Sequence, residues 1–321
     1  MMKRLAAGLL VGGLLFTGAV GAMAEDADDI HASVAFTFAD PRIDESSGLV
    51  AADGLAVTVN DSGDSNRIFT VDMTSGETVG LTSWPGDAVD IEALAPAGHG
   101  QVWVGDIGDN QRSRTSVTVT KVPFGKGDRT VSATSYELVY PDGPHDAETL
   151  LRDPASGRLF VVAKEWRARV YAAPVDLKAG QRNHLTQVEG NALGFATDGA
   201  FLPDGRHIVV RGYTQAGVYT WPGLDRVGTF DLPAQRQGEG LAVLGSADLL
   251  LSSEGTRSAV LRVELPTDLQ AKLKAQPQQA ASPATEPEST DAEERDVWPW
   301  AIGGVVGLVL IAVLIRALRR R

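Results

Sequence analysis

The chain has 321 residues, a formal net charge of −12 and no cysteine. This acidity argues against a nucleic-acid partner, because proteins that bind nucleic acids present clustered positive charge to the phosphates. The lack of cysteine excludes disulfides, so an exported form of this chain depends on core packing or on bound metal for its stability.

The first 24 residues are typical of a secretory signal peptide. A positive start precedes an uncharged apolar stretch over residues 5–20, and residues 22–24 (Ala-Met-Ala) form a small-x-small cleavage site. A retained transmembrane anchor is the alternative. We expect the mature chain to begin near Glu25 and to be exported.

Between residues 47 and 266 one pattern recurs: a small or acidic residue before an apolar group, a β-rich run, a polar loop and a second β-rich run. Its five copies begin at Ser47, Glu92, Glu148, Asp198 and Glu239. Repeats of roughly 40–55 residues with several short strands are typical of propeller blades. We therefore predict an all-β fold, a β-propeller of five four-stranded blades over residues 31–266. Six blades are the alternative.

The fifth copy ends at Pro266 without a fourth strand, whereas residues 32–38 alternate like a strand and belong to no copy. We expect this N-terminal strand to complete the last blade, because joining the two chain ends in one blade closes the ring and removes open sheet edges. The fourth strands of the other blades are predicted at residues 78–84, 135–140, 184–188 and 226–230.

The C-terminal part of the sequence changes character twice. Residues 267–297 are rich in Pro, Ala, Glu and Ser, which predicts a disordered stalk. Residues 298–318 are predicted to form a transmembrane helix, since the stretch from Trp300 is apolar apart from Arg316 and is long enough to span a bilayer. The basic tail at residues 319–321 then lies in the cytoplasm, and the propeller lies outside the cell membrane as part of a single-pass protein.

Charged side chains gather in the segments that propeller topology places on one face of the ring, namely the starts of the innermost strands and the loops after the second strands. We predict that they form a ligand-binding mouth from Glu92, Glu148, Asp198, Glu239, Glu254, His145, Lys164 and Arg211. Two alternatives stay open. In the first, the acids that recur at the same position hold the blades together by accepting backbone N–H groups. In the second, the two basic residues form simple salt bridges to the acidic ring.

Two loops on this face are rich in oxygen-bearing side chains, contributed by Asp61, Asp64, Asp106, Asp109 and Asn110. Ca²⁺ takes several oxygen ligands of this kind, so the loops are candidate calcium ligands. The alternative is that Asp, Asn and Gly serve here only as turn formers.

A resemblance to bacterial exported β-propellers of the phytase-like and NHL-like kind is carried by four strings: Glu45-Ser46-Ser47-Gly48-Leu49, Asn60-Asp61-Ser62-Gly63, Gly105-Asp106-Ile107-Gly108-Asp109-Asn110 and Asp146-Ala147-Glu148. True propeller phytases, as this resemblance implies, have six blades, several Ca²⁺ ions and basic residues that hold phosphate.

These features predict a membrane-anchored extracellular binding module for a small anionic ligand or an envelope protein, stabilised by Ca²⁺. One alternative is a metal-assisted hydrolase of phosphoesters or other anionic esters, in which Asp61, Asp106 and Glu148 hold the metal while Lys164 and Arg211 hold the anion. A glycosidase that uses two channel carboxylates is a third reading. The absence of a nucleophile motif favours binding, although the sequence does not decide whether the protein is an enzyme.

Overall fold

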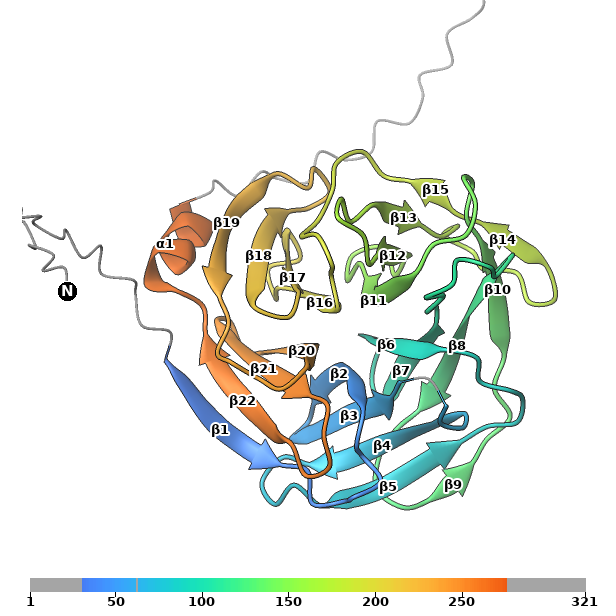
Figure 1. Ribbon diagram of the computed structural model, residues 1–321, viewed down its shortest axis with the longest axis horizontal. Coiled ribbons are helices and arrows are strands. Elements are labelled where there is room, and N and C mark those ends of the chain that lie inside the picture. The colour runs from blue at the N-terminus through green and yellow to red at the C-terminus, as the bar shows by residue number, and fades with distance from the viewer. Residues whose placement is uncertain (1–30, 62, 276–321) are drawn as a thin grey trace, which may run out of the picture. The chain divides into compact units, whose positions relative to one another are not determined.

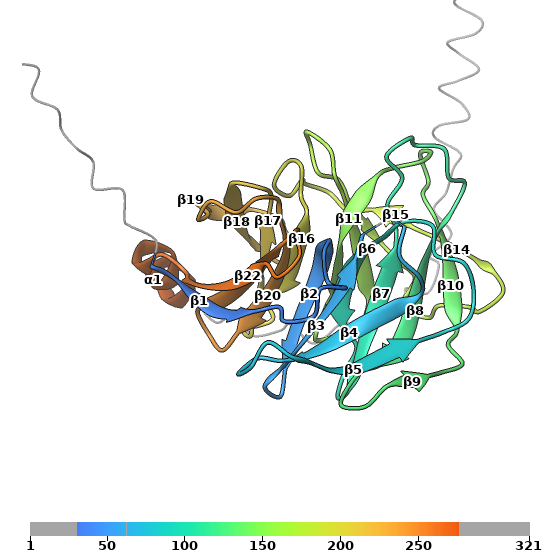
Figure 2. The same cartoon turned by 60° about the horizontal axis from the view of Figure 1, so that its bottom comes forward.

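The computed structural model describes residues 31–61 and 63–275, and within these ranges the chain forms five β-sheets and one short helix. Figure 1 shows the sheets arranged like blades around a common centre, and Figure 2 shows the same ring turned about the horizontal axis. The prediction of a five-bladed β-propeller is therefore confirmed, and the six-bladed alternative is wrong.

The strands of each blade follow one another from the centre outward. Blade 1 contains β2 (Ser46–Ala52), β3 (Leu55–Asn60), β4 (Arg67–Asp72), β5 (Thr78–Ser83) and β9 (Arg129–Thr130). Blade 2 contains β6 (Ile91–Pro96), β7 (Gln101–Asp106), β8 (Val117–Pro123), β10 (Ser135–Val139) and β14 (Arg182–His184). Blade 3 contains β11 (Ala147–Arg152), β12 (Leu159–Ala163), β13 (Val170–Ala172) and β15 (Thr186–Gln187). Blade 4 contains β16 (Asp198–Phe201), β17 (His207–Arg211), β18 (Gln215–Thr220) and β19 (Arg226–Asp231). Blade 5 contains β20 (Gly238–Leu244), β21 (Asp248–Ser253), β22 (Ala259–Glu264) and β1 (Ala32–Thr37).

The N-terminal strand closes the ring as predicted. β1 pairs antiparallel with β22, with Val34 opposite Leu261 and Phe36 opposite Val260. The first described strand of the chain thus completes the last blade, so opening the ring requires the separation of this pair. Such a closure leaves no unpaired edge between the two ends of the propeller.

The outer edges of blades 1 to 3 differ from the prediction. The expected fourth strand at residues 184–188 is divided, because β14 ends at His184 and pairs with β10 of blade 2, whereas β15 pairs with β13 of blade 3. Leu185, between them, is buried and donates its N–H to the carbonyl of Val139 at 2.9 Å. β9 similarly adds to the edge of blade 1 through a parallel pairing with β5. Sequence alternation does not reveal such short edge strands, because only the neighbouring edge makes them extended.

The core lies between the blades rather than in one central body. Strands that are covered on both faces have few polar residues, as in β12, where all five residues are buried. Five hydrophobic clusters each join two neighbouring blades. They join blades 1 and 2 through Val57 and Val102, blades 2 and 3 through Val119 and Val161, blades 3 and 4 through Val162 and Val210, blades 4 and 5 through Val218 and Leu249, and blades 5 and 1 through Leu250 and Phe69.

The predicted disordered stalk begins with a helix instead. α1 spans Thr267–Ala275 and lies beside β19 at the rim (Figure 1). Leu269 is buried there, in a space that exists because residue 228 is glycine: a Cβ at Gly228 would come within 2.4 Å of the Leu269 side chain. Lys272 pairs with Asp268 at 2.9 Å, one helical turn away. The sequence composition hid this docking because two leucines, Leu269 and the partly buried Leu273, are its apolar contacts with the core.

No helix within residues 31–61 and 63–275 is long and apolar enough to cross a bilayer. The predicted signal peptide, most of the predicted stalk and the predicted transmembrane helix at residues 298–318 lie outside the described residues.

Candidate functional site

Polar residues surround one end of the central channel. The five innermost strands β2, β6, β11, β16 and β20 start at this end, each near a buried polar residue, and the loops after the second strands lie here too because successive strands are antiparallel. We use the name acidic mouth for the group Asp61, Asp90, Glu92, Glu148, Lys164, Glu239 and Glu254. It contains six carboxylates and one ammonium group.

Three of these carboxylates converge. Asp61 follows β3, whereas Asp90 and Glu92 stand at the start of β6 in the next blade, and one oxygen from each lies within 4.8 Å of the other two. Glu92 is buried and accepts a hydrogen bond from the Ser47 hydroxyl at 2.8 Å. Asp90 is 9% exposed, and its Oδ1 is buried with no hydrogen-bond partner among the described residues.

Electrostatics make this cluster unfavourable without a cation or a proton. Two unit charges 4.8 Å apart repel by roughly 3 kcal/mol at an effective dielectric of about 20. Burial, reinforced by the charge of Asp61, raises the pKa of Asp90 to about 6. Burial and the nearby Glu148 raise the pKa of Glu92 well above its ordinary value. A divalent cation with oxygen ligands would relieve the same repulsion, and the carboxylate set fits Ca²⁺.

Lys164 and Glu148 form an ion pair across the blade 3 hairpin. Lys164 Nζ donates to Glu148 Oε1, and it lies 5.3 Å from the ring centre of Tyr213 in blade 4. Burial raises the pKa of Glu148 to about 8 although Lys164 opposes this shift. Burial also disfavours the ammonium, but the Glu148 carboxylate raises the pKa of Lys164. Burial therefore works against both charges of this pair, and the attraction between the two groups works in favour of both.

Glu239 and Glu254 occupy the blade 5 side of the mouth. One amide, that of Gln237, donates to Glu239 Oε1 at 3.1 Å and also to Glu254 Oε1. Burial raises the pKa of Glu239 to about 7. The second oxygens of Glu239 and Glu148 are buried and without hydrogen-bond partners among the described residues. Both side chains therefore have unused acceptor capacity in the mouth.

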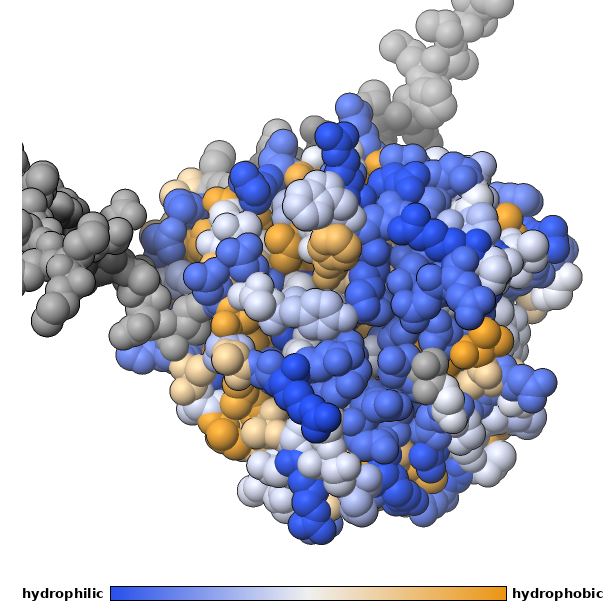
Figure 3. Space-filling view, viewed as in Figure 1, coloured by the Kyte–Doolittle hydropathy of each residue, from blue (hydrophilic) through white to orange (hydrophobic). Residues whose placement is uncertain are grey.

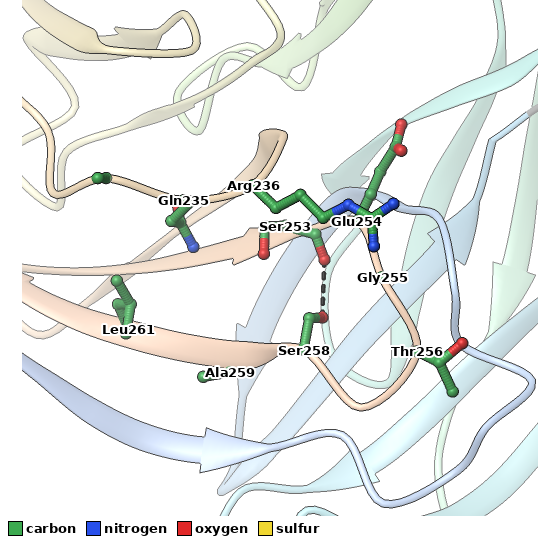
Figure 4. A pocket seen from close by; sticks show the side chains of 10 residues that line it. Gln235, Arg236, Ser253, Glu254, Gly255, Thr256, Ser258, Ala259 and Leu261 are labelled. Atoms are coloured by element: carbon green, nitrogen blue, oxygen red, sulfur yellow. Dashed lines mark hydrogen bonds between the residues drawn. The ribbon is translucent and has the colours of Figure 1, made fainter.

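Glu254 also borders an open hollow of about 320 Å³ beside the mouth (Figure 4). Arg236 packs along its edge, with a guanidinium nitrogen 3.8 Å from where a Cβ of Gly255 would stand. The hydroxyl of Ser258 donates to the carbonyl of Ser253 at 2.7 Å and fixes the loop between β21 and β22. Burial raises the pKa of Glu254, and the charge of Arg236 opposes this shift.

Arg211, predicted to hold a ligand, is instead fully buried. Its guanidinium donates to the carbonyls of Gly240 at 3.0 Å and Ser252 at 3.3 Å, and to the amide oxygen of Gln235 at 3.3 Å. Burial lowers its pKa to about 10. The residue joins blades 4 and 5, so it is not placed to contact a ligand in the mouth.

Asp198 holds neighbouring blades together by accepting backbone N–H groups, which is the alternative role given above for the recurring acids. Its carboxylate accepts N–H groups from Leu241 at 2.7 Å in blade 5, from Gly199 at 2.8 Å and from Leu49 at 3.3 Å in blade 1. These bonds occupy it inside the ring, where it is completely buried. The recurring acidic position thus has two uses: blade fastening at Asp198, and the mouth at Glu92, Glu148 and Glu239.

His145 is not part of the acidic mouth. Its ring nitrogens contact Glu165 and Asp142, each at 2.9 Å, and its ring stacks on Tyr171 at 5.1 Å. Arg169 bridges the same two carboxylates. This network connects blade 3 with the segment that leads into it, and it occupies both ring nitrogens of His145.

Most predicted calcium ligands order their own loops. Asp64 pairs with Arg67 at 2.8 Å, Asp106 accepts from Arg114 at 2.7 Å, and Asp109 accepts the N–H groups of Ser113 and Arg114 at 2.9 and 2.8 Å. Asn110 is exposed. Only Asp61 of this predicted set joins the three-carboxylate cluster, where it meets two acids from another blade. The contacts of Asp64, Asp106 and Asp109 agree with the turn-forming alternative, and a calcium role for these residues stays a prediction.

Asp90 is the residue that the metal prediction missed. The sequence places it two positions before Glu92, but alternation within a strand gives no hint that it approaches Asp61 from a different blade. Asp106 helps to set this geometry, because it accepts the N–H groups of Val89 and Asp90 at 3.1 and 3.0 Å. The available signal was the pairing of Asp90 with Glu92 at the start of one innermost strand.

The far end of the channel has a different character. A cavity of about 240 Å³ there is lined mainly by apolar residues such as Leu49, Leu94, Leu150 and Leu202. The turns that join the first and second strands of the blades, such as the one around Asp53 and Gly54, lie at this end. Figure 3 shows a largely hydrophilic surface over the middle of the ring, with hydrophobic groups scattered around it.

The comparisons with known proteins do not assign the chain to a family. No protein-family model matches the chain, and no curated protein matches it. Among solved structures, the chain is similar to the PQQ-bound form of an aldose sugar dehydrogenase from Streptomyces coelicolor. That similarity has a TM-score of 0.42 and 11% sequence identity, and it covers 73% of this chain and 98% of the other. We draw no conclusion about activity or cofactor from a similarity of this size.

Proposed function

We propose that the protein is a membrane-anchored, extracellular binding module whose acidic mouth binds a divalent cation, Ca²⁺, and through that cation an anionic ligand or envelope protein. The observation that carries the proposal is the convergence of Asp61, Asp90 and Glu92 within 4.8 Å, with a nearly buried Asp90 oxygen that lacks a partner among the described residues. Ca²⁺ completes its coordination with further oxygens, which a ligand carboxylate or phosphate supplies. The membrane anchor rests on the sequence of the two chain ends.

The structure weakens the support for the phosphoester hydrolase. That reading needs basic residues to hold the anion, but Arg211 is buried against backbone carbonyls and Lys164 is paired with Glu148. Asp106, one of its metal ligands, accepts from Arg114 outside the cluster. The mouth therefore favours capture of a cation over direct capture of an anion, and the phytase-like resemblance supports calcium binding more than phosphate chemistry.

Thermal unfolding of the full-length protein in mild detergent tests the proposal. Free Ca²⁺ at about 100 times its Kd stabilises the folded state by roughly 2.7 kcal/mol, which raises the Tm of a domain this size by roughly 5–10 °C above its value in EDTA. Asp61→Asn should remove most of this shift. Asp53→Asn, at the opposite end of the β2–β3 hairpin, is the matched control and should keep it.

Equal Tm values in Ca²⁺ and EDTA would contradict the proposal. Turnover of p-nitrophenyl phosphate that depends on Ca²⁺ and is lost in Lys164→Ala would instead support the hydrolase.

A further inference from the structure

A second hollow lies outside the acidic mouth, at the rim of blades 2 and 3. It has a volume of about 630 Å³ and lies between the β7–β8 loop, the β12–β13 loop and the segment around β15. Its exposed lining side chains are Arg112, Trp166, Arg167, Gln187 and Asn191. The side chains of these five residues belong neither to the buried core nor to the proposed calcium site.

Trp166 is the most exposed large hydrophobic side chain among the described residues, at 81%. Its ring meets that of Phe195 edge-to-face at 5.9 Å. The loop that carries it is fixed on both sides, since Ala192 donates to the carbonyl of Ala168 at 2.9 Å and Phe195 to that of Glu165 at 2.8 Å. An indole held in water on an ordered loop adds nothing to the core and forms a ready platform for a flat ligand face.

The charge of this hollow is opposite to that of the chain. Three arginines and one glutamate line it, whereas the whole chain carries −12. Glu165 anchors the group, because it accepts from Arg169 at 2.8 Å and lies 3.5 Å from the guanidinium of Arg112. Arg169 also pairs with Asp142 at 2.6 Å, so its guanidinium is occupied by two carboxylates.

Two guanidinium groups remain available for an anion. The Arg112 side chain is 55% exposed, with one long contact to Glu165. Arg167 is exposed, and the described part of the chain offers it neither an ion pair nor a hydrogen bond. Guanidinium groups bind carboxylates through two parallel hydrogen bonds, which makes them suited to an acidic ligand in an otherwise acidic protein.

We propose that this hollow binds an acidic saccharide, such as an oligosaccharide of hexuronic acids. The indole of Trp166 stacks against a sugar ring, Arg112 and Arg167 bind the carboxylate, and the amides of Gln187 and Asn191 exchange hydrogen bonds with hydroxyl groups. An acidic peptide would use the arginines, but it would use neither the aromatic platform nor the amide pair in this way. The hollow thus gives the ring a ligand contact that is independent of the calcium site.

Isothermal titration of the full-length protein with trigalacturonate, in EDTA so that the calcium site does not contribute, tests this assignment. Maltotriose, a neutral trisaccharide, should bind at least about tenfold more weakly, a difference of ~1.4 kcal/mol. Trp166→Ala and Arg167→Gln should each weaken trigalacturonate binding by about tenfold, because each removes one contact worth on the order of that energy. Arg257→Gln, an exposed arginine of blade 5, is the matched control and should bind like wild type.

Three results would overturn the assignment. The first is no binding of trigalacturonate at roughly 10 mM, a concentration above the Kd of a specific site. The second is equal affinity for the acidic and the neutral trisaccharide. The third is an affinity for trigalacturonate that neither variant changes. If hexa-aspartate bound as tightly as trigalacturonate with the same dependence on Trp166 and Arg167, the site would belong to an acidic peptide instead. Circular dichroism of each variant separates lost binding from lost folding.

Discussion

Replacing Asp90 with Asn should stabilise the metal-free protein and remove its response to calcium. Folding raises the pKa of Asp90 from 3.8 to about 6, so the ionised carboxylate is disfavoured in the folded state above that pH. Each pKa unit is worth about 1.4 kcal/mol, so a shift of about two units corresponds to roughly 3 kcal/mol. Water at the channel mouth screens part of this, which leaves about 1–3 kcal/mol.

The asparagine has the same shape, carries no charge and offers N–H donors to the carboxylates of Asp61 and Glu92. In EDTA at pH 8, Asp90→Asn should therefore raise the Tm by about 2–12 °C. Adding Ca²⁺ should then change it by less than a third of the wild-type response, because one of three ligands has lost its charge. Asp87→Asn, at an exposed position in the same loop, should alter the unfolding free energy by less than about 0.5 kcal/mol.

Differential scanning calorimetry at pH 8, with EDTA and with Ca²⁺, measures both effects on one pair of proteins. A variant that is less stable than wild type in EDTA would refute the electrostatic reasoning. A variant that keeps the full calcium shift would show that the ion binds without Asp90.

Four further results follow from the structure. In EDTA, the unfolding free energy should fall as pH rises from about 5 to 8. The reason is that folding raises the pKa values of Asp90, Glu239 and Glu148 to about 6, 7 and 8, so unfolding releases protons. Chemical denaturation at several pH values measures this dependence, and an unfolding free energy that rises with pH would contradict it. Lys164→Met should lower the unfolding free energy at pH 8 by about 0.5–1 kcal/mol, since Glu148 must then take up a proton in the buried site, and adding Glu148→Gln should restore much of the loss. Leu269→Ala should cost about 2–4 kcal/mol if α1 is docked as described, and no change in urea unfolding would mean that it is not. Deleting residues 31–37 should abolish cooperative unfolding, because β22 then has no partner on its outer side and the ring stays open.

The fold could be predicted from the sequence because the same pattern of residue types recurs in every blade. Each blade shows the same order of small or acidic residue, apolar run and polar loop. The last repeat lacks a fourth strand, and this predicted that the strand near Val34 completes it. The outer edges were harder to predict. β9 and β14 consist of two and three residues, and a neighbouring edge rather than their own alternation makes them strands. Helix α1 escaped prediction because only two leucines, the buried Leu269 and the partly buried Leu273, pack against the core.

The site was predicted only in outline. Chain topology was enough to place Asp61, Glu92, Glu148, Lys164 and Glu239 at one end of the channel, since antiparallel strands bring those loops together. It gave no information about which acids turn inward to backbone N–H groups and which remain open in the mouth. Asp198 and Arg211 look like ligand residues in the sequence, and their burial between blades depends on side-chain packing that no local pattern records.

A crystal structure grown in about 10 mM CaCl₂ tests the central claim most directly. The account predicts one ion in the acidic mouth, with oxygens of Asp61, Asp90 and Glu92 at roughly 2.3–2.6 Å from it. A well-ordered mouth that contains only water at that concentration, with the three carboxylates in the same positions, would contradict it.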